Sequence, residues 1–544
     1  MKKYIIILLV TLLSTSCVCL CSEKLLTVAE ASDYKKTSTS ADVMLFLKKL
    51  TEKSNDIRIE TLLITNEGRR CPMVIIGNPL LTNPNQAKRD ERLVVYIQAN
   101  IHAGEVAGKE ATMMLMREML FGKLTHLPEK IIFIIVPNLN ADGNDKISTD
   151  NRSYIPGPEG GVGTRFTSQG LDPNRDYIKL DTPEIAATIE KIYNVWDPLL
   201  TFDMHTTNGS FHKHFMTYAS GQSPSIDPTL SDYTWNKLFP AIANASKGDG
   251  LFTLPYGNFK DALNPEEGWQ AFPDTPRLST CYVSFRARFS ILCEAYAHID
   301  FKTRVWASYV YLVNALEYIA NHADEMKAVV KKAEAASASI ATIPNNRRPK
   351  MPLEFEPVKS GTITIHSYEF EKRKEPNVYP RYKPHYEKEV TYTIPLMTKY
   401  TATRDRTYAA AYILPAGAKK VVKHLLKHGV HVEKIEEDFT AEYRKFHVEK
   451  LNTSKLPSQG HWRTFVKGEW KPEKGLISDG SYYVPMNQPP VRLISAMLEP
   501  DASDSLVSWN FFDSWLVPQW GRRLLPYPVL RLDELPKIYS TSVK

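Results

Sequence analysis

An apolar run that leads into a histidine and a glutamate constrains this chain most strongly. Residues Leu93–Ile97 are continuously apolar, and the stretch QANIHAGE follows, with His102 and Glu105 in H-x-x-E spacing. A continuous apolar run predicts a strand that is covered on both faces of its sheet. Two ligands three residues apart at the end of such a strand can bind one metal ion. H-x-x-E is common by chance, so a metal site requires further ligands from elsewhere in the chain.

The segments after this strand predict the fold class. A helix is expected over Glu110–Leu120, followed by a second buried strand, Ile131–Val136. Strand, helix and strand in this order form a βαβ unit, so we predict an α/β fold with a mixed, largely parallel central sheet and helices on both faces. Sites in such sheets form at the carboxyl ends of strands. His102 lies just beyond one of these ends.

A third candidate ligand follows another apolar strand. Leu199–Met204 is expected to be a strand, and His205 comes directly after it, 100 residues beyond Glu105. Catalytic zinc sites use three protein ligands and an open position. His212 and His214 form a nearby H-x-H pair, but they follow the turn signal Asn-Gly-Ser and are interpreted as loop histidines.

Glu294 lies inside the apolar strand Phe289–Ala295, which reads FSILCEA. A buried carboxylate is costly unless it is paired or has a chemical role. One interpretation is a salt bridge to Arg286 or Arg288. The other, which we favour, is a general base, because the predicted site still lacks one.

Composition limits the classes of function. The 544 residues contain 43% hydrophobic and 24% charged residues, as expected for a globular protein with two or more domains. The net charge of +7 is spread along the chain, which does not suggest nucleic-acid binding. The body of the chain contains Cys71, Cys281 and Cys293, too few for a disulfide scaffold. Cys281 and Cys293 are expected either to pair or to remain buried thiols.

The first 22 residues resemble a secretory signal peptide. Lys2 and Lys3 precede an apolar run, Tyr4–Leu13, that is too short to span a bilayer. Removing this segment leaves a charge of +7 − 2 = +5. We expect an exported protein, secreted or periplasmic, with no transmembrane segment. A lipid anchor at Cys17 is the less favoured alternative, because Ser14, Thr15 and Ser16 lack the usual apolar residue.

The chain is predicted to contain two regions after the signal. Residues 23–340 form a catalytic domain, 341–352 a linker rich in Pro, Asn and Arg, and 353–544 a mainly β accessory region. One short helix is expected there, over about Ala418–Lys427, with Gly429 as its C-cap signal. Its aromatic side chains are expected to be core residues: Trp462, Trp470, Tyr482, Tyr483, Trp509 and Trp515.

The motifs together resemble the zinc carboxypeptidase family, the carboxypeptidase A-like metallocarboxypeptidases, over residues 40 to 325. The resemblance rests on signals in the family's order: H-x-x-E at 102–105, NADG at 140–143, the pair Asn174-Arg175, the strand-end His205 and the strand residue Glu294. The family often has NPDG where this chain has NADG.

The resemblance implies a role for each of these residues. His102, Glu105 and His205 would bind one Zn²⁺, and Glu294 would be the general base and acid. Asn174 and Arg175 would hold the terminal carboxylate of the substrate. Arg165, ten residues before Arg175, would stabilise the oxyanion, with Arg152 as the competing candidate. The family's closing tyrosine would be Tyr256 or Tyr282.

These expectations define the predicted function as a zinc metallocarboxypeptidase acting on peptides or proteins with a free C-terminus. An amidase or endopeptidase acting on cell-wall or modified peptides is the main alternative. A non-catalytic peptide-binding protein is disfavoured, because a binding scaffold needs no base beside a metal. A serine hydrolase is also disfavoured, because the chain has no G-x-S-x-G motif.

Overall fold

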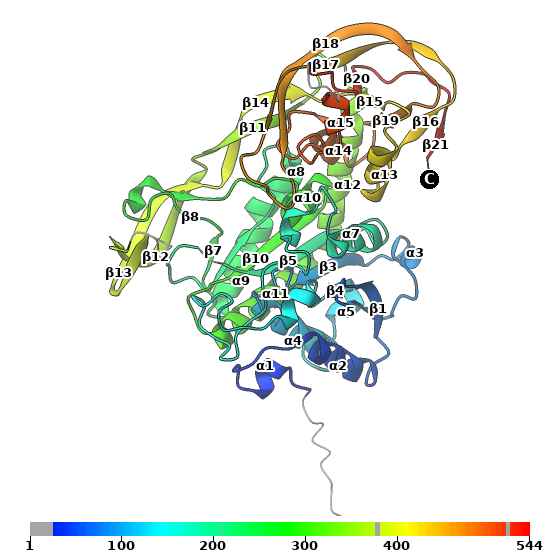
Figure 1. Cartoon of the computed structure of the whole chain (residues 1–544). Coiled ribbons are helices and arrows are strands. Elements are labelled where there is room, and N and C mark those ends of the chain that lie inside the picture. Colours follow the sequence, from blue (N-terminus) through cyan, green and yellow to red (C-terminus); the bar gives the residue numbers. More distant parts are fainter. Residues whose placement is uncertain (1–24, 208, 376–380, 518–522, 544) are drawn as a thin grey trace, which may run out of the picture.

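The computed structural model describes residues 25–207, 209–375, 381–517 and 523–543 (Figure 1). The predicted signal peptide and Cys17 lie outside these ranges, so their assignment remains a prediction. Within these ranges, no helix is both long enough and apolar enough to cross a bilayer.

An eight-stranded sheet forms the centre of the N-terminal region, residues 25–340. Its strand order is β1-β2-β4-β3-β5-β10-β6-β7. The four central strands β4, β3, β5 and β10 run parallel to one another, as the βαβ pattern predicted, whereas β1, β2 and β6 bring antiparallel pairs. The predicted fold class is confirmed. The strands are β1 (Ile57–Ile64), β2 (Arg70–Ile76), β3 (Leu93–Ala99), β4 (Ile131–Val136), β5 (Leu200–Thr206), β6 (Met216–Ala219), β7 (Thr253–Pro255) and β10 (Phe289–Ala295).

Helices cover both faces of this sheet, so alternate strand residues enter two different cores. Val95 and Ile97 of β3 belong to the core shared with α2, α4, α9 and α11. Val94 and Tyr96 belong to the core shared with α7, η2 and α10. This burial on both sides explains the continuous apolar runs in the sequence. The helices are α1 (Val28–Ala31), α2 (Ser40–Thr51), α3 (Pro84–Ala87), α4 (Ala107–Phe121), α5 (Leu127–Lys130), α6 (Ala141–Asp145), η1 (Pro173–Arg175), α7 (Pro183–Thr188), η2 (Ile189–Tyr193), α8 (Pro228–Tyr233), η3 (Thr234–Leu238), α9 (Phe239–Gly248), η4 (Pro265–Glu267), α10 (Ser279–Phe285), α11 (Phe301–Asn321), α12 (Ala323–Ser339) and η5 (Ile340–Thr342).

Helix α8 begins at Pro228, and the side chain of its N-cap residue, Asp227, accepts the Thr229 N–H at 3.0 Å. The wider π-helical turn η3 precedes Pro240, which has no N–H to donate to the regular helix ladder. The chain therefore continues into α9.

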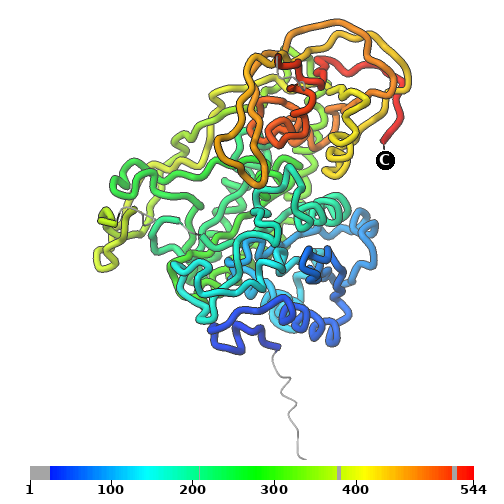
Figure 2. The backbone as a smooth tube through the Cα atoms, viewed as in Figure 1, coloured from blue at the N-terminus to red at the C-terminus, as the bar shows by residue number. Residues whose placement is uncertain are grey.

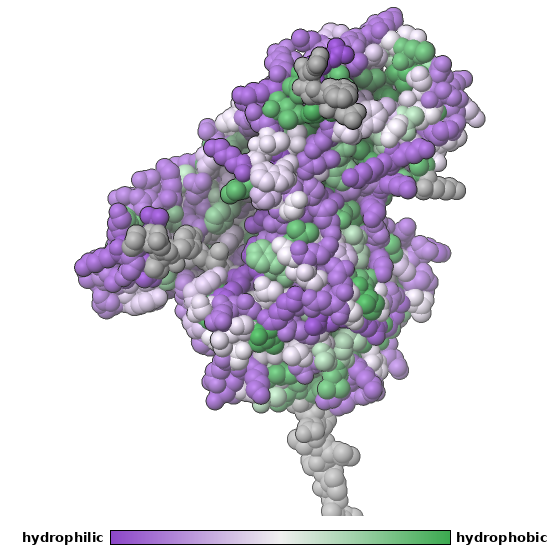
Figure 3. All heavy atoms as spheres, in the orientation of Figure 1, coloured by the Kyte–Doolittle hydropathy of each residue, from purple (hydrophilic) through white to green (hydrophobic). Residues whose placement is uncertain are grey.

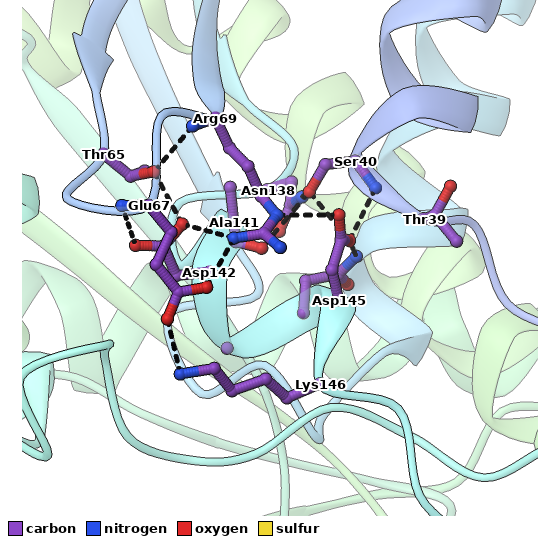
Figure 4. A network of polar contacts seen from close by, with 12 residues as sticks. Thr39, Ser40, Thr65, Glu67, Arg69, Asn138, Ala141, Asp142, Asp145 and Lys146 are labelled. Atoms are coloured by element: carbon purple, nitrogen blue, oxygen red, sulfur yellow. Dashed lines mark hydrogen bonds and ion pairs between the residues drawn. The ribbon is translucent and has the colours of Figure 1, made fainter.

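A network of polar contacts anchors α6, which contains most of the NADG sequence (Figure 4). The carboxylate of Asp142 accepts hydrogen bonds from the hydroxyl of Thr65 at 2.6 Å and the guanidinium of Arg69 at 2.9 Å. Just before α6, the Asn140 side chain donates to the carbonyl of Arg165 at 3.3 Å. The network thus fixes one end of the loop that carries Arg165.

The C-terminal region, residues 353–543, is mainly β, as predicted. Its long strands lie on two hairpins, β12–β13 and β17–β18, which Figure 1 shows at the left and at the top of the molecule. The predicted helix over 418–427 is confirmed as α13, and Gly429 beyond it has a φ of +73°, the left-handed conformation of a C-cap glycine. The elements from β8 onward not yet given are β8 (Asn258–Phe259), β9 (Trp269–Gln270), β11 (Lys350–Val358), β12 (Gly361–Lys372), β13 (Tyr382–Met397), β14 (Lys399–Thr407), β15 (Ala411–Leu414), α13 (Lys419–Lys427), β16 (Glu433–Ile435), β17 (Phe439–Thr453), β18 (Thr464–Ile477), β19 (Tyr482–Pro485), α14 (Val491–Leu498), α15 (Asp513–Leu516), β20 (Leu530–Leu532) and β21 (Ser540–Ser542).

The two regions share backbone pairing and a hydrophobic core. Strand β13 pairs in parallel with β9, which lies in the 248–280 segment of the N-terminal region. One core cluster contains Tyr282 from α10 together with Leu425 from α13. Arg348, in the predicted linker, is buried and donates to the carbonyls of Ile343 and Tyr408. The predicted linker is therefore anchored at Arg348, although most of its other residues are exposed or partly buried, and the boundaries at 340 and 353 remain a prediction.

The aromatic residues of the C-terminal region are not all core residues. Trp509 is buried, as expected, but Trp462 is 55% exposed, which corrects the prediction for that residue. The face of the molecule in Figure 3 is mostly hydrophilic, with hydrophobic side chains in groups separated by polar surface.

Candidate metal centre

The three predicted ligands lie together at the carboxyl ends of β3 and β5. His102 and Glu105 occupy the turn between β3 and α4, and His205 is the next-to-last residue of β5. One donor atom from each residue lies within 4.8 Å of the others. All three side chains are buried. Two histidines and a glutamate at this spacing are a suitable ligand set for Zn²⁺.

The sheet register explains why His205 and Glu294 face the same site. In the parallel pair β5 and β10, Glu294 lies opposite His205. Side chains alternate between the faces of a sheet, so Asp203, two residues before His205, points to the same side. The neighbouring residues Met204 and Cys293 enter the opposite core.

Both imidazole rings turn Nδ1 toward Glu105. The distances from Nδ1 to a Glu105 carboxylate oxygen are 3.0 Å for His102 and 2.8 Å for His205. The Nε2 atoms lie 3.0 Å from Asp172 and 2.9 Å from Asp203. A metal-binding histidine usually donates its second ring N–H to a carboxylate, which fixes its tautomer and orientation. The donor set and its supporting carboxylates thus fit a zinc ion.

The charges around the three residues favour a bound cation. Burial lowers the pKa of His205, but the carboxylates of Asp203 and Glu105 outweigh burial and hold that pKa well above its ordinary value. Burial raises the pKa of Glu105, but Arg152 and the two histidines hold it well below its ordinary value. The site therefore keeps the Glu105 carboxylate ionised and attracts a proton to the imidazole of His205. A metal ion would compete for the same ring nitrogens.

Glu294 differs from the other carboxylates of the site. It is 7% exposed, and its Oε2 atom has no hydrogen-bond partner among the described residues. Burial is the main cause that raises the pKa of Glu294 to about 8, with Glu105 acting in the same direction and His205 opposing it.

The alternative interpretation of Glu294 as a structural ion-pair partner is excluded by where the two arginines lie. Arg288 pairs with Asp197 and Glu334, and Arg286 donates to the carbonyl of His428. Neither guanidinium pairs with Glu294.

Asn174 and Arg175 lie on the 3₁₀ turn η1, beside the histidines. The Asn174 amide nitrogen lies 3.3 Å from Nε2 of His205, and its oxygen accepts the Ser279 N–H at 3.0 Å. Arg175 donates to the Asn174 carbonyl at 2.7 Å. Burial lowers the pKa of Arg175; Asp172 opposes this shift, and the nearby Arg165 adds to it.

Arg165 and Arg152, the two candidates for oxyanion stabilisation, both lie beside the candidate ligands. Arg165 holds Asp172 with Nε at 2.9 Å, and its Nη1 lies 3.2 Å from Nδ1 of His102. Arg152 donates to the Glu105 carboxylate. Gly104 leaves room for this arginine, because a Cβ there would lie 2.9 Å from the Arg152 side chain.

The two tyrosine candidates occupy different environments. Burial raises the pKa of Tyr256 well above its ordinary value, and the charges of Glu294, Glu105, Arg165 and Arg175 also act on its hydroxyl group. Tyr282 is buried on α10 and bonds to His428 at 2.9 Å. Tyr256 is therefore the tyrosine beside the site.

Several other residues lie outside the metal site or were not anticipated. His212 and His214 lie in the connection between β5 and β6, as expected, and His212 stacks on Tyr296. Cys281 and Cys293 are buried free thiols. Asp172 and Asp203 were not predicted as site residues. Their positions two residues before Asn174 and His205, in D-x-N-R and D-x-H, could have indicated them.

Comparisons with known proteins match part of the chain to a known family and most of it to curated relatives. Residues 43–287 match a family model described as "Zinc carboxypeptidase". "Carboxypeptidase 2" of Trichophyton rubrum is 22% identical over 491 residues, covering 86% of this chain and 81% of the relative. "Probable carboxypeptidase 2" of Arthroderma benhamiae is 22% identical over 466 residues, covering 81% of this chain and 80% of the relative. These alignments are longer than the N-terminal region, so each extends into the C-terminal region.

Solved structures show a weaker likeness. A metallo-carboxypeptidase from Burkholderia cenocepacia has a TM-score of 0.39 and 16% identity, covering 53% of this chain and 70% of that one. Carboxypeptidase A from Helicoverpa armigera has a TM-score of 0.41 and 16% identity, covering 53% and 75%. At TM-scores below 0.5, these structures add nothing to the assignment.

The family match and the curated relatives identify the class of this protein. Residues 43–287 form a domain of the zinc carboxypeptidase family, and the chain is a metallocarboxypeptidase, a hydrolase.

Proposed function

We propose that this protein is an exopeptidase that removes C-terminal residues from peptides or proteins, using one Zn²⁺ held by His102, Glu105 and His205. One arrangement of residues supports the proposal. Donor atoms of these three buried residues lie within 4.8 Å of one another, and Glu294 lies opposite His205 on the neighbouring strand. The Glu294 carboxylate is buried, and one of its oxygens has no hydrogen-bond partner among the described residues. A buried carboxylate without partners is costly, which favours a chemical role.

Glu294 is the proposed general base and acid. Bound zinc would supply Lewis acidity, polarising the scissile carbonyl and acidifying a water molecule. Glu294 takes a proton from the attacking water and then delivers it to the leaving amine. Arg165 or Arg152 stabilises the negative charge that develops on the carbonyl oxygen, because both guanidiniums lie against the metal-binding residues.

Arg175 and Asn174 are the proposed binding pair for the terminal carboxylate. A guanidinium can bind a carboxylate through two parallel hydrogen bonds, which favours arginine over lysine for this role. Arg175 has no ion-pair partner within 4.0 Å among the described residues, so its charge is available to a substrate. Tyr256 is the proposed tyrosine that contacts bound substrate.

Matched peptides test the exopeptidase assignment. Each sequence is made with a free and an amidated C-terminus and digested with the zinc-loaded protein, and the products are identified by mass spectrometry. We expect stepwise loss of terminal residues from the free acids alone. Internal cleavage, or equal cleavage of the amides, would instead indicate the endopeptidase or amidase alternative.

We also propose export through the signal peptide at 1–22, from its charged start and short apolar run. Intact-mass measurement of the protein recovered from its native compartment tests this. A mature mass lacking about 22 residues is expected, whereas a protein that keeps Met1–Ser22 would contradict it.

A further inference from the structure

A turn of the C-terminal region reaches the metal centre. The turn at 454–463 connects β17 to β18, and Figure 2 shows this orange segment extending down toward the catalytic domain. The side-chain oxygen of Gln459 accepts the backbone N–H of Asp172 at 2.8 Å. His461 of the same turn lies 2.8 Å from Asp181. Both contacts fall on the loop that carries Asn174 and Arg175.

Asp172 is the residue through which this turn affects the site. Its carboxylate binds His102 at 3.0 Å, pairs with Arg165 at 2.8 Å and accepts the Asn174 N–H at 2.9 Å. Asp172 is 4% exposed, so its own N–H needs a partner within the protein. Gln459 is that partner and fixes the peptide from which the Asp172 side chain extends.

A second contact supports the other side of the same loop. Asp504, which is fully buried, accepts the Arg277 N–H at 3.2 Å and lies 3.5 Å from its guanidinium. The Arg277 carbonyl accepts the Tyr177 N–H at 3.2 Å, and Ser279 donates to the Asn174 side chain at 3.0 Å. The segment 277–279 is therefore paired with 174–177 and is itself held by the C-terminal region.

We propose that the C-terminal region completes the catalytic site, with Gln459 and Asp504 as positioning residues. Gln459 acts through Asp172 on His102 and Arg165, and Asp504 acts through Arg277 and Ser279 on Asn174. The proposal rests on the proposed function for the role of Asn174 and Arg175. It assigns the C-terminal region a part in metal binding and substrate binding, beyond covering the catalytic domain.

The first test measures zinc affinity without turnover. Metal-free wild type, Gln459→Ala, Gln459→Glu and Lys455→Ala compete for zinc against a chromophoric chelator. Carboxylate partners of metal-binding histidines typically contribute about 10–100-fold to affinity, and Gln459 acts one hydrogen bond further away, so we expect Gln459→Ala to weaken binding about 3–10-fold. Gln459→Glu keeps the accepting oxygen and should restore most of the affinity.

Lys455→Ala is the matched control, because Lys455 is exposed in the same turn. Thermal melts of the four proteins separate a local effect from unfolding. A Gln459→Ala protein with wild-type zinc affinity and wild-type kcat would overturn the positioning role of Gln459.

The second test concerns Asp504. Asp504→Asn keeps the side-chain shape but removes the charge beside Arg277. We expect KM for free-acid peptides to rise about 3–10-fold with little change in zinc affinity, because Asp504 acts on Asn174 only through Arg277 and Ser279. Unchanged KM and kcat would overturn the role of Asp504.

The exopeptidase function and the positioning role of Gln459 are tested by separate measurements. If the wild type released no C-terminal residues from any peptide, the proposed exopeptidase function would fail. A weakened zinc affinity in Gln459→Ala would still support the positioning role, because that measurement needs no substrate.

Discussion

The central sheet and the β17–β18 hairpin use β-structure in opposite ways. Six of the seven residues of β10 are buried, whereas β18 alternates between exposed and partly buried residues over most of its 14 positions. In β10, a charged side chain is exceptional and carries a cost, so Glu294 is conspicuous. In the hairpin, charged and polar residues are the rule, so Gln459 is not conspicuous although it reaches the metal centre. Functional residues are therefore easier to recognise where burial makes them costly.

The largest effect that this comparison predicts is at a metal ligand. We expect His205→Ala to lose zinc and at least about 10³-fold in kcat/KM, because Lewis-acid stabilisation of a transition state amounts to several kcal/mol. Zinc content by mass spectrometry and peptide hydrolysis measure both losses. His126→Ala is the matched control: His126 pairs with Glu317 on the surface and should keep metal and activity. Full activity in His205→Ala would contradict the site.

The next largest effect is expected at a buried carboxylate of the C-terminal region. Its removal should lower the free energy of unfolding without loss of zinc, unlike removal of a metal ligand in the catalytic domain. Glu499 is buried and binds Tyr412 at 2.7 Å, Arg406 at 2.8 Å and Arg531 at 3.3 Å. Arg406 keeps its ion pair with Asp501, but Glu499→Ala leaves the buried Arg531 without an acidic partner among the described residues, which typically costs about 3–5 kcal/mol. Denaturant unfolding should show this loss, and zinc per chain should stay near one.

The control for Glu499→Ala is a surface glutamate of the same region. Glu442 lies 4.0 Å from Lys474 with its side chain 85% exposed, so Glu442→Ala should change stability by less than about 1 kcal/mol. Equal destabilisation by the two substitutions would remove the distinction between the buried and exposed charges.

A smaller, pH-dependent effect is expected at Glu184 in the catalytic domain. Glu184 is buried, neither carboxylate oxygen has a partner among the described residues, and burial raises its pKa to about 7. The folded state therefore binds this proton more tightly than the unfolded state, so stability falls as pH rises from about 4.5 and the full penalty is present above 7.

Replacing Glu184 by Gln tests the sign of this effect. Glu184→Gln should be more stable than wild type at pH 8, by up to about 3 kcal/mol, and the difference should vanish toward pH 4.5. Unfolding curves at both pH values, with the exposed Glu159→Gln as control, measure it. A pH-independent difference would show that the carboxyl group does not titrate as described.

The sequence alone was sufficient to predict the buried strands and the candidate metal ligands at their carboxyl ends. Strand β10 has the predicted bounds, and His102, Glu105 and His205 come together because two parallel strands end at the same edge. Continuous apolar runs, and charged residues within them, are local signals that can be recognised in a single sequence.

The sequence alone was insufficient to predict burial and pairing that depend on tertiary contacts. Trp462 has the composition of a core residue but lies on an exposed turn, and Arg348 in the predicted linker is packed against backbone carbonyls. The contact between Gln459 and Asp172 joins residues 287 positions apart and leaves no periodic signal. Such pairings depend on how the two regions dock.

Glu294 is the proposed residue for the proton transfers, beside a zinc ion held by His102, Glu105 and His205. The most direct measurement compares zinc content and single-turnover hydrolysis of a free-acid peptide in wild type and Glu294→Gln. We predict one zinc per chain in both proteins and a rate at least about 10²-fold lower in the variant, the lower end of what general acid–base catalysis contributes. A variant that keeps its zinc and most of its rate would contradict the assignment of the base.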